Sequence, residues 1–170
     1  MEEEQINNAM EKLYKEIEVL KEQTIKRGLA FSSPTREQLK KKLRSTHTPF
    51  ISGQSWKSIG YPLDTFKYII YVHNPDPNQY FNFYAYFFFG PANLIPDIGT
   101  ALLSAENRLN RMFAEFPGFN PDSTEYVQFN YKFPSGTPPG LYLGNSFIFM
   151  MDQHDVGTYI DRGCIYVTVN

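Results

Sequence analysis

Apolar residues near the N-terminus recur with alternating spacings of four and three. The residues that follow this pattern are Ile6, Met10, Leu13, Ile17 and Leu20. The spacing predicts a helix over roughly residues 3–27 with one apolar face. Gly28, after a basic pair, is a suitable end for that helix. We expect the apolar face to bind protein, either the chain's own sheet or another chain in a coiled coil.

A second, short helix is predicted after the first. Ser33 is suited to cap it and Pro34 to occupy its first position, and the pattern continues to about Arg44. Leu39 and Leu43 form its apolar side.

From Phe50 onward the apolar period changes to two, which predicts strands over 66–72, 80–89, 127–133, 141–151 and 164–169. Turn residues at 74–78 and 134–140 predict two hairpins, and 161–163 a tight turn. Between the hairpins, apolar spacing predicts a helix over about 98–115. We therefore expect an α+β fold, mostly antiparallel β-sheet with one packed helix and a long N-terminal helical arm. The arm would span 1–45 and the sheet domain 46–170, within a single domain overall.

Charge is distributed unevenly along these 170 residues, whose formal net charge is −2. Lysine and arginine are concentrated before Phe50, whereas the rest of the chain is rich in Tyr and Phe and poor in charge. Such a surface is typical of protein interfaces, so we expect partners to cover part of it. The acidic N-terminus predicts no secretory signal, and no apolar run is long enough to span a membrane.

The search for catalytic and metal-binding motifs is mostly negative. The three histidines are far apart in sequence, and phosphate-loop, dinucleotide and nucleophile-elbow motifs are absent. We predict no catalytic residues, no metal site and no cofactor. The alternative is a small hydrolase or metal-binding enzyme that uses the loop from Asp152 to Asp161, which includes His154 and Asp155. Cys164, at an alternating strand position, is predicted to be a buried apolar residue.

The second helix is strongly basic. Its cations are Lys40, Lys41, Lys42 and Arg44. They form either a solvated face or a surface that meets phosphate, and an N-terminal arm that folds back would offset their field with Glu2, Glu3 and Glu4.

Two short segments resemble a known family. Ser52-Gly53-Gln54-Ser55-Trp56-Lys57-Ser58-Ile59 resembles the Thr-Gly-x-Leu-x-x-Ser-Ile segment of tailed-phage neck and tail-completion proteins. Tyr84-Ala85-Tyr86-Phe87-Phe88-Phe89-Gly90 is similar to the Tyr-Ala-rich stretch that ends Phe-Gly in those proteins. The resemblance covers about residues 1–116, and the strand-rich tail after Phe119 departs from it.

The resemblance implies a structural virion protein, a subunit of a homo-oligomeric head-to-tail connector ring that contacts portal, capsid or tail proteins. The resemblance carries over no catalytic residue, and a connector ring would allow DNA to pass the basic segment without sequence preference. From the length of the apolar runs we expect no membrane partner. A non-viral coiled-coil adaptor is a further alternative. Besides the apolar face of the first helix, we expect the protein interface to include Trp56, Tyr84, Tyr86 and Phe88.

Overall fold

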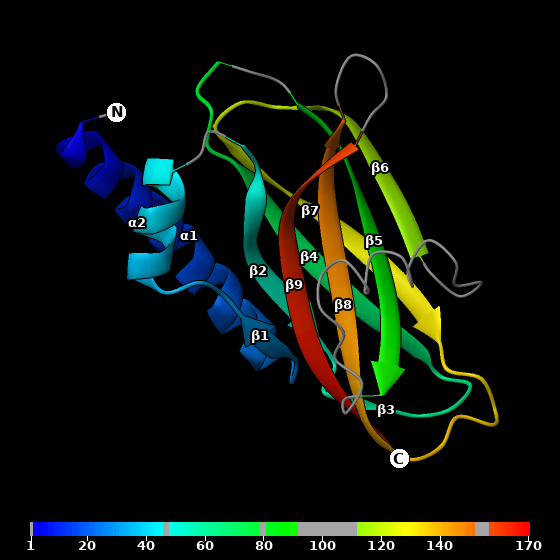
Figure 1. Cartoon of the computed structure of the whole chain (residues 1–170). Helices are drawn as coiled ribbons and strands as arrows, with labels where there is room; N and C mark the ends of the chain where they lie inside the picture. The colour runs from blue at the N-terminus through cyan, green and yellow to red at the C-terminus, as the bar shows by residue number, and fades with distance from the viewer. Residues whose placement is uncertain (1, 46–47, 79–80, 92–111, 152–156) are drawn as a thin grey trace.

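The protein, studied as a computed structural model, is a β-sandwich with two helices packed on one side (Figure 1). The structure describes residues 2–45, 48–78, 81–91, 112–151 and 157–170, with side chains left out at 45, 88–91, 112–119, 151 and 157. Its described part is mostly antiparallel sheet, as the α+β prediction requires.

Among the described residues, the elements follow one another as helices α1 and α2 with strand β1 between them, and then strands. Their bounds are α1 Glu3–Lys26, β1 Ala30–Ser32, α2 Arg36–Ser45, β2 Phe50–Trp56, β3 Ile59–Gly60, β4 Thr65–Asn74, β5 Phe81–Pro91, β6 Met112–Phe119, β7 Ser123–Lys132, β8 Gly140–Met151 and β9 Gly157–Val169. One sheet has the order β1-β2-β4-β7 and the other β3-β9-β8-β5-β6.

This order is that of an immunoglobulin-like sandwich. The chain switches sheets early, because β2 pairs antiparallel with β4 whereas β3 pairs parallel with β9. The switch is held by backbone bonds from Thr168 N to Ser58 O (2.9 Å) and from Asn170 N to Gly60 O (3.0 Å). Side chains from the inner faces of both sheets form the main core.

The two predicted hairpins are wrong, although their strands form. β4 and β5 lie in different sheets, and so do β7 and β8. Residues 74–78 form side-chain turns, with Asp76 N donating to Asn74 Oδ1 (3.0 Å) and Asn78 N to Asp76 Oδ1 (2.9 Å). Such turns change the direction of the chain between the two sheets. They do not form a hairpin, because a hairpin requires a connection that keeps its two strands paired in register.

Two further predictions fail in the second half of the chain. Met112–Phe119 forms strand β6, paired with β5, where the end of a helix was predicted; residues 98–111 of that helix lie outside the described residues. β9 runs unbroken through the predicted turn at 161–163. Its pairing with β8 instead skips Ile160, since Ile148 pairs with Asp161 and Phe149 with Tyr159. An extra residue of this kind is a β-bulge, which changes the direction of nearby side chains.

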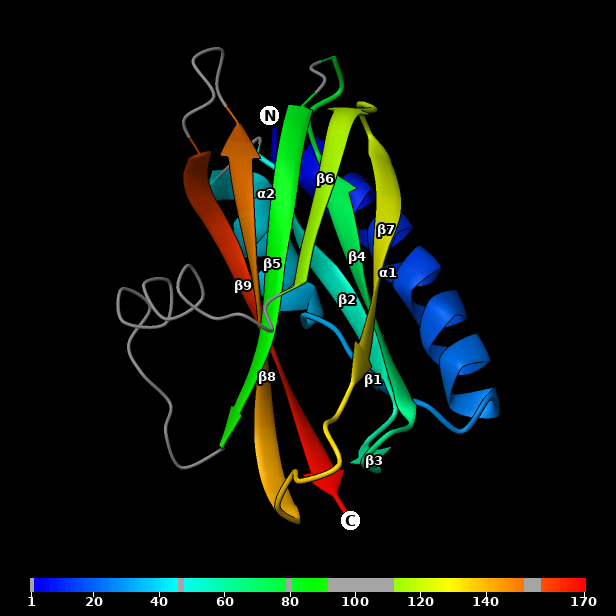
Figure 2. The same cartoon turned by 90° about the vertical axis from the view of Figure 1, so that its right-hand side faces the viewer.

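Both helices lie beside the outer face of the four-stranded sheet (Figures 1 and 2). α1 ends as predicted, with Gly28 in the left-handed conformation (φ 75°). α2 begins later than predicted, because Thr35 rather than Ser33 caps it: Thr35 Oγ1 accepts from Gln38 N (3.2 Å), and Thr35 N donates to Gln38 Oε1 (2.9 Å). β1, within the predicted arm, pairs with β2, so the arm is tied directly to the sheet.

A buried polar group joins the two sheets. Tyr68 OH, on β4, bonds Gln54 Oε1 on β2 and Ser146 Oγ on β8, the latter at 3.0 Å. Burial raises the pKa of the Tyr68 phenol above its ordinary value, which keeps the hydroxyl neutral. A Cβ at Gly163 would lie 2.6 Å from Gln54 Oε1, so this group requires glycine at that place in β9.

Candidate functional site

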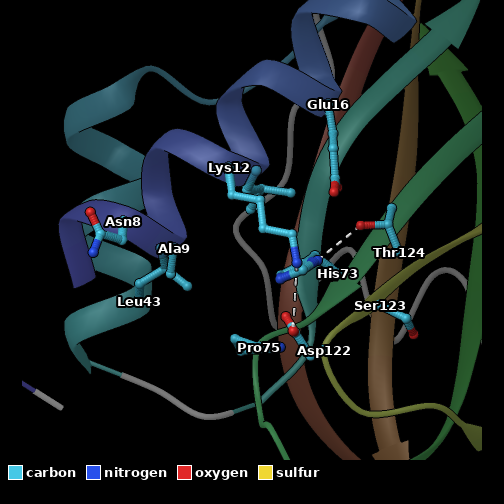
Figure 3. Close-up of a pocket in the computed structure, with 11 residues that line it drawn as sticks. Asn8, Ala9, Lys12, Glu16, Leu43, His73, Pro75, Asp122, Ser123 and Thr124 are labelled. Atoms are coloured by element: carbon cyan, nitrogen blue, oxygen red, sulfur yellow. Dashed lines mark hydrogen bonds and ion pairs between the residues drawn. The ribbon is translucent and has the colours of Figure 1, made fainter. Parts of the chain in front are cut away.

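A pocket of about 280 Å³ lies between the N-terminal half of α1 and the ends of β4 and β7 (Figure 3). Its wall on the helix side mixes apolar and polar side chains, and its opposite wall comes from His73, Pro75 and the turn before β7. The lining residues are Asn8, Ala9, Lys12, Leu13, Glu16, Leu43, His73, Pro75, Asp122, Ser123 and Thr124. The pocket is near the lower limit of size for small-ligand sites.

His73 is the buried polar residue of this pocket. Its ring meets the Phe50 ring edge-on, with centroids 5.7 Å apart, and its Nδ1 bonds Thr124 Oγ1 at 2.9 Å. The two residues are direct neighbours in the β4–β7 register. Burial lowers the pKa of His73 to about 4, while Asp122 raises it and Lys12 lowers it by smaller amounts. The imidazole is therefore neutral at pH 7.

The rim of the pocket carries an ion pair between a lysine and an aspartate. Lys12 Nζ lies 3.8 Å from Asp122 Oδ2, and both side chains are largely exposed. Asp122 has a left-handed backbone (φ 42°), and its N donates to Asp76 O at 2.9 Å. Asn74 Nδ2 donates to Asn120 O at 3.0 Å. These bonds fix the turn, so the rim carboxylate has a defined position.

The arrangement is better suited to binding than to proton transfer. A group with a pKa of about 4 is a weak general base at neutral pH, and the threonine already occupies Nδ1 of His73. Within the residues that the structure describes, no group of three or more His, Cys, Asp or Glu side chains could hold a metal ion. The pocket offers a wall of mixed polar and apolar helix side chains, a neutral imidazole, and a rim that carries both a lysine and an aspartate.

A second feature is a set of exposed apolar residues on β3, just after it, and on the neighbouring strands β8 and β9, which we call the β3 corner. β3 lies near the C-terminus at one end of the sandwich (Figure 1). Ile59 and Leu141 flank Thr168 in the sheet, and Tyr166 lies two residues away on the same face. Tyr61 and Leu63 follow β3. These five side chains are 41 to 59 % exposed, and among the described residues they account for most of the exposed large apolar side chains.

The predicted interface residues of α1 are mostly buried inside the chain. Ile6, Met10, Leu13 and Ile17 pack with Leu39, Leu43 and Phe50 in a second core between α1, α2 and β2, and Leu20 is partly exposed. The apolar face of α1 therefore packs within its own chain in this fold, and not in a coiled coil with another chain. In this conformation the four buried residues are not available to a coiled-coil partner.

The predicted aromatic interface residues lie on the five-stranded sheet or beside it. Trp56 donates from Nε1 to Tyr166 O (3.0 Å) and packs on the main core. Tyr84 and Tyr86 are half-buried on the outer face of β5, where the Tyr84 ring stacks on Phe149 at 4.9 Å. Phe88 belongs to β5, and its side chain lies outside the described part.

The basic residues of α2 are engaged in ion pairs. Lys40 Nζ lies 2.9 Å from Glu3 Oε1, and Arg44 bonds the same carboxylate. Lys42 Nζ lies 3.0 Å from Asp161 Oδ2, and Lys41 is an exposed residue of the same helix. α1 thus folds back so that Glu3 offsets the basic segment.

Only part of the alternative enzyme site, the loop from Asp152 to Asp161, lies within the described residues. Asp152, His154 and Asp155 lie outside the described residues. Asp161 is on β9, where its carboxylate accepts from Ile51 N (2.8 Å) and pairs with Lys42, so it joins β9 to β2 and α2. Cys164 is exposed on β9, and the prediction that it is buried is wrong, because the bulge at Ile160 sets the odd-numbered residues after it toward the core.

Sequence reasoning missed both the pocket and the β3 corner. His73 carried the one usable signal, a histidine at the end of an alternating strand, whereas Lys12 and Asp122 carried none. For the β3 corner, the alternation placed Leu141 and Tyr166 in strands but did not indicate whether their side chains face the core or the solvent.

Neither a family model nor a curated protein sequence matches this chain. Among solved structures, the C-terminal domain of Wzt is similar with a TM-score of 0.50 and 11 % identity, over 74 % of this chain and 75 % of that one. A CARDB domain from Pyrococcus furiosus has a TM-score of 0.40, with 11 % identity over 72 % of this chain and 86 % of that chain. A Niemann-Pick type C2 protein from the Japanese carpenter ant has a TM-score of 0.42, with 8 % identity over 74 % and 96 %. The Wzt likeness shows the sandwich fold alone.

Proposed function

We propose that this chain is a non-catalytic subunit of a protein assembly, and that the β3 corner is a contact surface for a neighbouring subunit. The observation that carries the proposal is that Ile59, Leu141 and Tyr166 are exposed on adjoining strands. Tyr61 and Leu63, which follow β3 in the chain, are exposed as well. Contiguous exposed apolar side chains mark interaction sites, and tyrosine is enriched in interface cores.

In its specific form, the assembly is a head-to-tail connector ring in a virion, with portal, capsid or tail proteins as the other partners. The support for this form is the resemblance of residues 52–59 and 84–90, which occupy β2, β3 and β5. No helix in the described part of the chain is long and apolar enough to cross a membrane.

The test is a native mass measurement of the purified chain over a range of concentrations. We expect self-association that Leu141→Asp weakens, because a carboxylate in an apolar contact is costly to desolvate. Val19→Asp is the matched control, since Val19 is equally exposed but lies on α1, away from the β3 corner.

Masses at a closed multiple of the subunit above two would support the ring. A monomer at every concentration would overturn the self-assembly proposal. Association that Leu141→Asp and Val19→Asp weaken equally would overturn the assignment to the β3 corner.

A further inference from the structure

A second pocket, of about 200 Å³, lies where β1, α2, β2 and β9 meet. It is smaller than the sites that hold drug-sized ligands, so it has room for a chemical group of a few heavy atoms. It shares no residue with the pocket beside His73 or with the β3 corner. Its polar side chains come from the link before α2, from α2 itself, and from β2 and β9.

Gln54, on β2, brings a buried amide to this pocket. Its side chain is 8 % exposed, and its Oε1 accepts from Tyr68 OH. Its Nε2 donates to no group in the described part of the chain. Among those residues every fully buried side-chain nitrogen or oxygen has a hydrogen-bond partner, so Nε2 reaches open space, which is the pocket that Gln54 lines. The pocket therefore holds a fixed donor that no acceptor of the described chain satisfies.

Arg162, on β9, supplies a cation that pairs with no acidic side chain among the described residues. Its Nε and Nη2 donate to Asn145 Oδ1 at 3.2 and 2.6 Å, and its guanidinium lies over the Phe147 ring, 5.5 Å from the centroid. These contacts position the side chain, but Asn145 is neutral and cannot compensate the charge. Arginine has five N–H donors, and three of them remain after the bonds to Asn145.

Lys42 adds a second cation, which Asp161 holds at the pocket. Lys42 Nζ lies 3.0 Å from Asp161 Oδ2, an oxygen that also accepts from Ile51 N at 2.8 Å. Asp161 Oδ1 accepts from Arg162 N at 2.8 Å, so donors of the chain already occupy both carboxylate oxygens. Asp161 is the acid among the lining residues, and the two cations leave an excess of one positive charge.

Ser33 lines the same pocket with a hydroxyl that the fold does not use for capping. Thr35 caps α2 in its place, and Ser33 Oγ bonds no group in the described part of the chain. A hydroxyl donates as readily as it accepts. Together with Gln54 and Arg162 it gives the pocket three separate donors for one acceptor group.

We propose that this pocket binds the carboxylate of a small organic acid. A carboxylate accepts several hydrogen bonds at its two oxygens and suits the fork of an arginine. Its single negative charge balances the excess positive charge of the pocket. A phosphate monoester carries about −1.5 to −2 at pH 7, which would leave negative charge beside Asp161. A neutral amide would leave the Arg162 charge uncompensated.

This site goes beyond the proposed function and does not depend on it. The experiment titrates the full chain with sodium acetate at constant ionic strength and follows the Gln54 side-chain amide and the Arg162 Nε–H by NMR. Acetate is expected to give saturable shifts at both groups, whereas acetamide, its neutral counterpart, gives none. Inorganic phosphate at the same concentrations is expected to bind more weakly than acetate.

Two sets of variants test the assignment to this pocket. Arg162→Gln is expected to weaken acetate binding roughly tenfold, the effect of losing a charge-assisted hydrogen bond. Lys132→Gln, an equal change of net charge at an exposed place on β7, is expected to leave the affinity unchanged. Ser33→Asp, which puts a second carboxylate at the pocket, is expected to abolish binding, whereas Ser33→Asn, of the same size, keeps it. Circular dichroism confirms that each variant is folded.

The Ser33 pair decides the question even if Arg162→Gln does not fold. Absence of saturable shifts in the wild type would overturn the inference, as would equal affinities in Ser33→Asp and Ser33→Asn. Tighter binding of phosphate than of acetate would overturn the choice of a carboxylate. A monomer that binds acetate would support this site and count against self-assembly, and an associating chain that does not bind acetate would do the reverse.

Discussion

At the scale of single residues, His73 shows how the fold sets the chemistry of the pocket. Its place at the end of β4 puts the ring against Phe50 and next to Thr124, and burial there favours the neutral imidazole. Desolvation is the main cause of the lowered pKa of His73. The neutral ring is therefore compatible with the fold at pH 7, whereas protonation of the ring in acid destabilises the fold.

This predicts a pH dependence of stability. An unfolded histidine titrates near its model value of 6.5, whereas folded His73 titrates at about 4. Between these values the unfolded chain binds a proton that the folded chain does not, so stability falls as the pH drops from 6.5 toward 4. The loss amounts to roughly 3 kcal/mol at most.

Urea unfolding at pH 7.5 and pH 5 measures the effect. His73→Phe, which keeps an aromatic ring beside Phe50, should lose less stability than the wild type over this interval. Carboxylates contribute equally to both proteins, so the difference isolates the histidine. An equal loss in both would show that His73 is accessible to protons in the folded state.

At the scale of elements, α1 is held by packing within the chain. Ile17 is 1 % exposed in the core between α1, α2 and β2, whereas Val19, two residues later, is 55 % exposed. We predict that Ile17→Ala costs about 2–5 kcal/mol of unfolding free energy. Val19→Ala should change it by less than about 0.5 kcal/mol. Chemical denaturation measures both, and equal effects would show that α1 is docked only loosely.

The elements could be predicted where the local pattern alone decides them. The apolar period of four and three identified α1, and the period of two identified β4, since both reflect one buried face. Partner choice could not be predicted, because β4 and β5 have the alternation of a hairpin yet belong to opposite sheets. At Met112, Phe113 and Phe116 the spacing fits a helix as well as a strand, and pairing with β5 selects the strand.

The candidate site could not be predicted for a different reason. Lys12, His73 and Asp122 come from α1, β4 and the turn before β7, and their meeting depends on how the helix lies across the sheet. The basic segment shows the same limit. Its residues were evident from the sequence, but their partners Glu3 and Asp161 lie 37 or more residues away in the chain.

At the scale of the whole molecule, charge is arranged to hold α2 in place. Glu3 pairs with Lys40 and Arg44, and those bonds lower the pKa of the Glu3 carboxyl, Arg44 contributing most. Asp161 holds Lys42 against β9. With a formal net charge of −2, the chain as a whole does not attract a polyanion. Any binding to DNA must therefore come from the local field of the basic segment.

The last prediction follows from this arrangement. We expect the chain to bind duplex DNA weakly and without sequence preference at low salt. Glu3→Gln should strengthen binding, because it releases Lys40 and Arg44 to contact phosphate. Two released cations would make the slope of log affinity against log salt more negative by up to about 2, given about 0.9 per phosphate contact.

Fluorescence anisotropy with a labelled duplex, repeated over a salt series, measures both quantities. Glu4→Gln is the matched control, since it changes net charge equally at an exposed neighbour on the same turn of α1. A gain confined to Glu3→Gln would mean that the basic segment contacts the backbone and that Glu3 limits it. Equal gains would mean that only net charge matters, and the segment would then have no role in DNA passage. If neither variant binds, Lys40, Lys42 and Arg44 serve to fix α2 on α1 and β9.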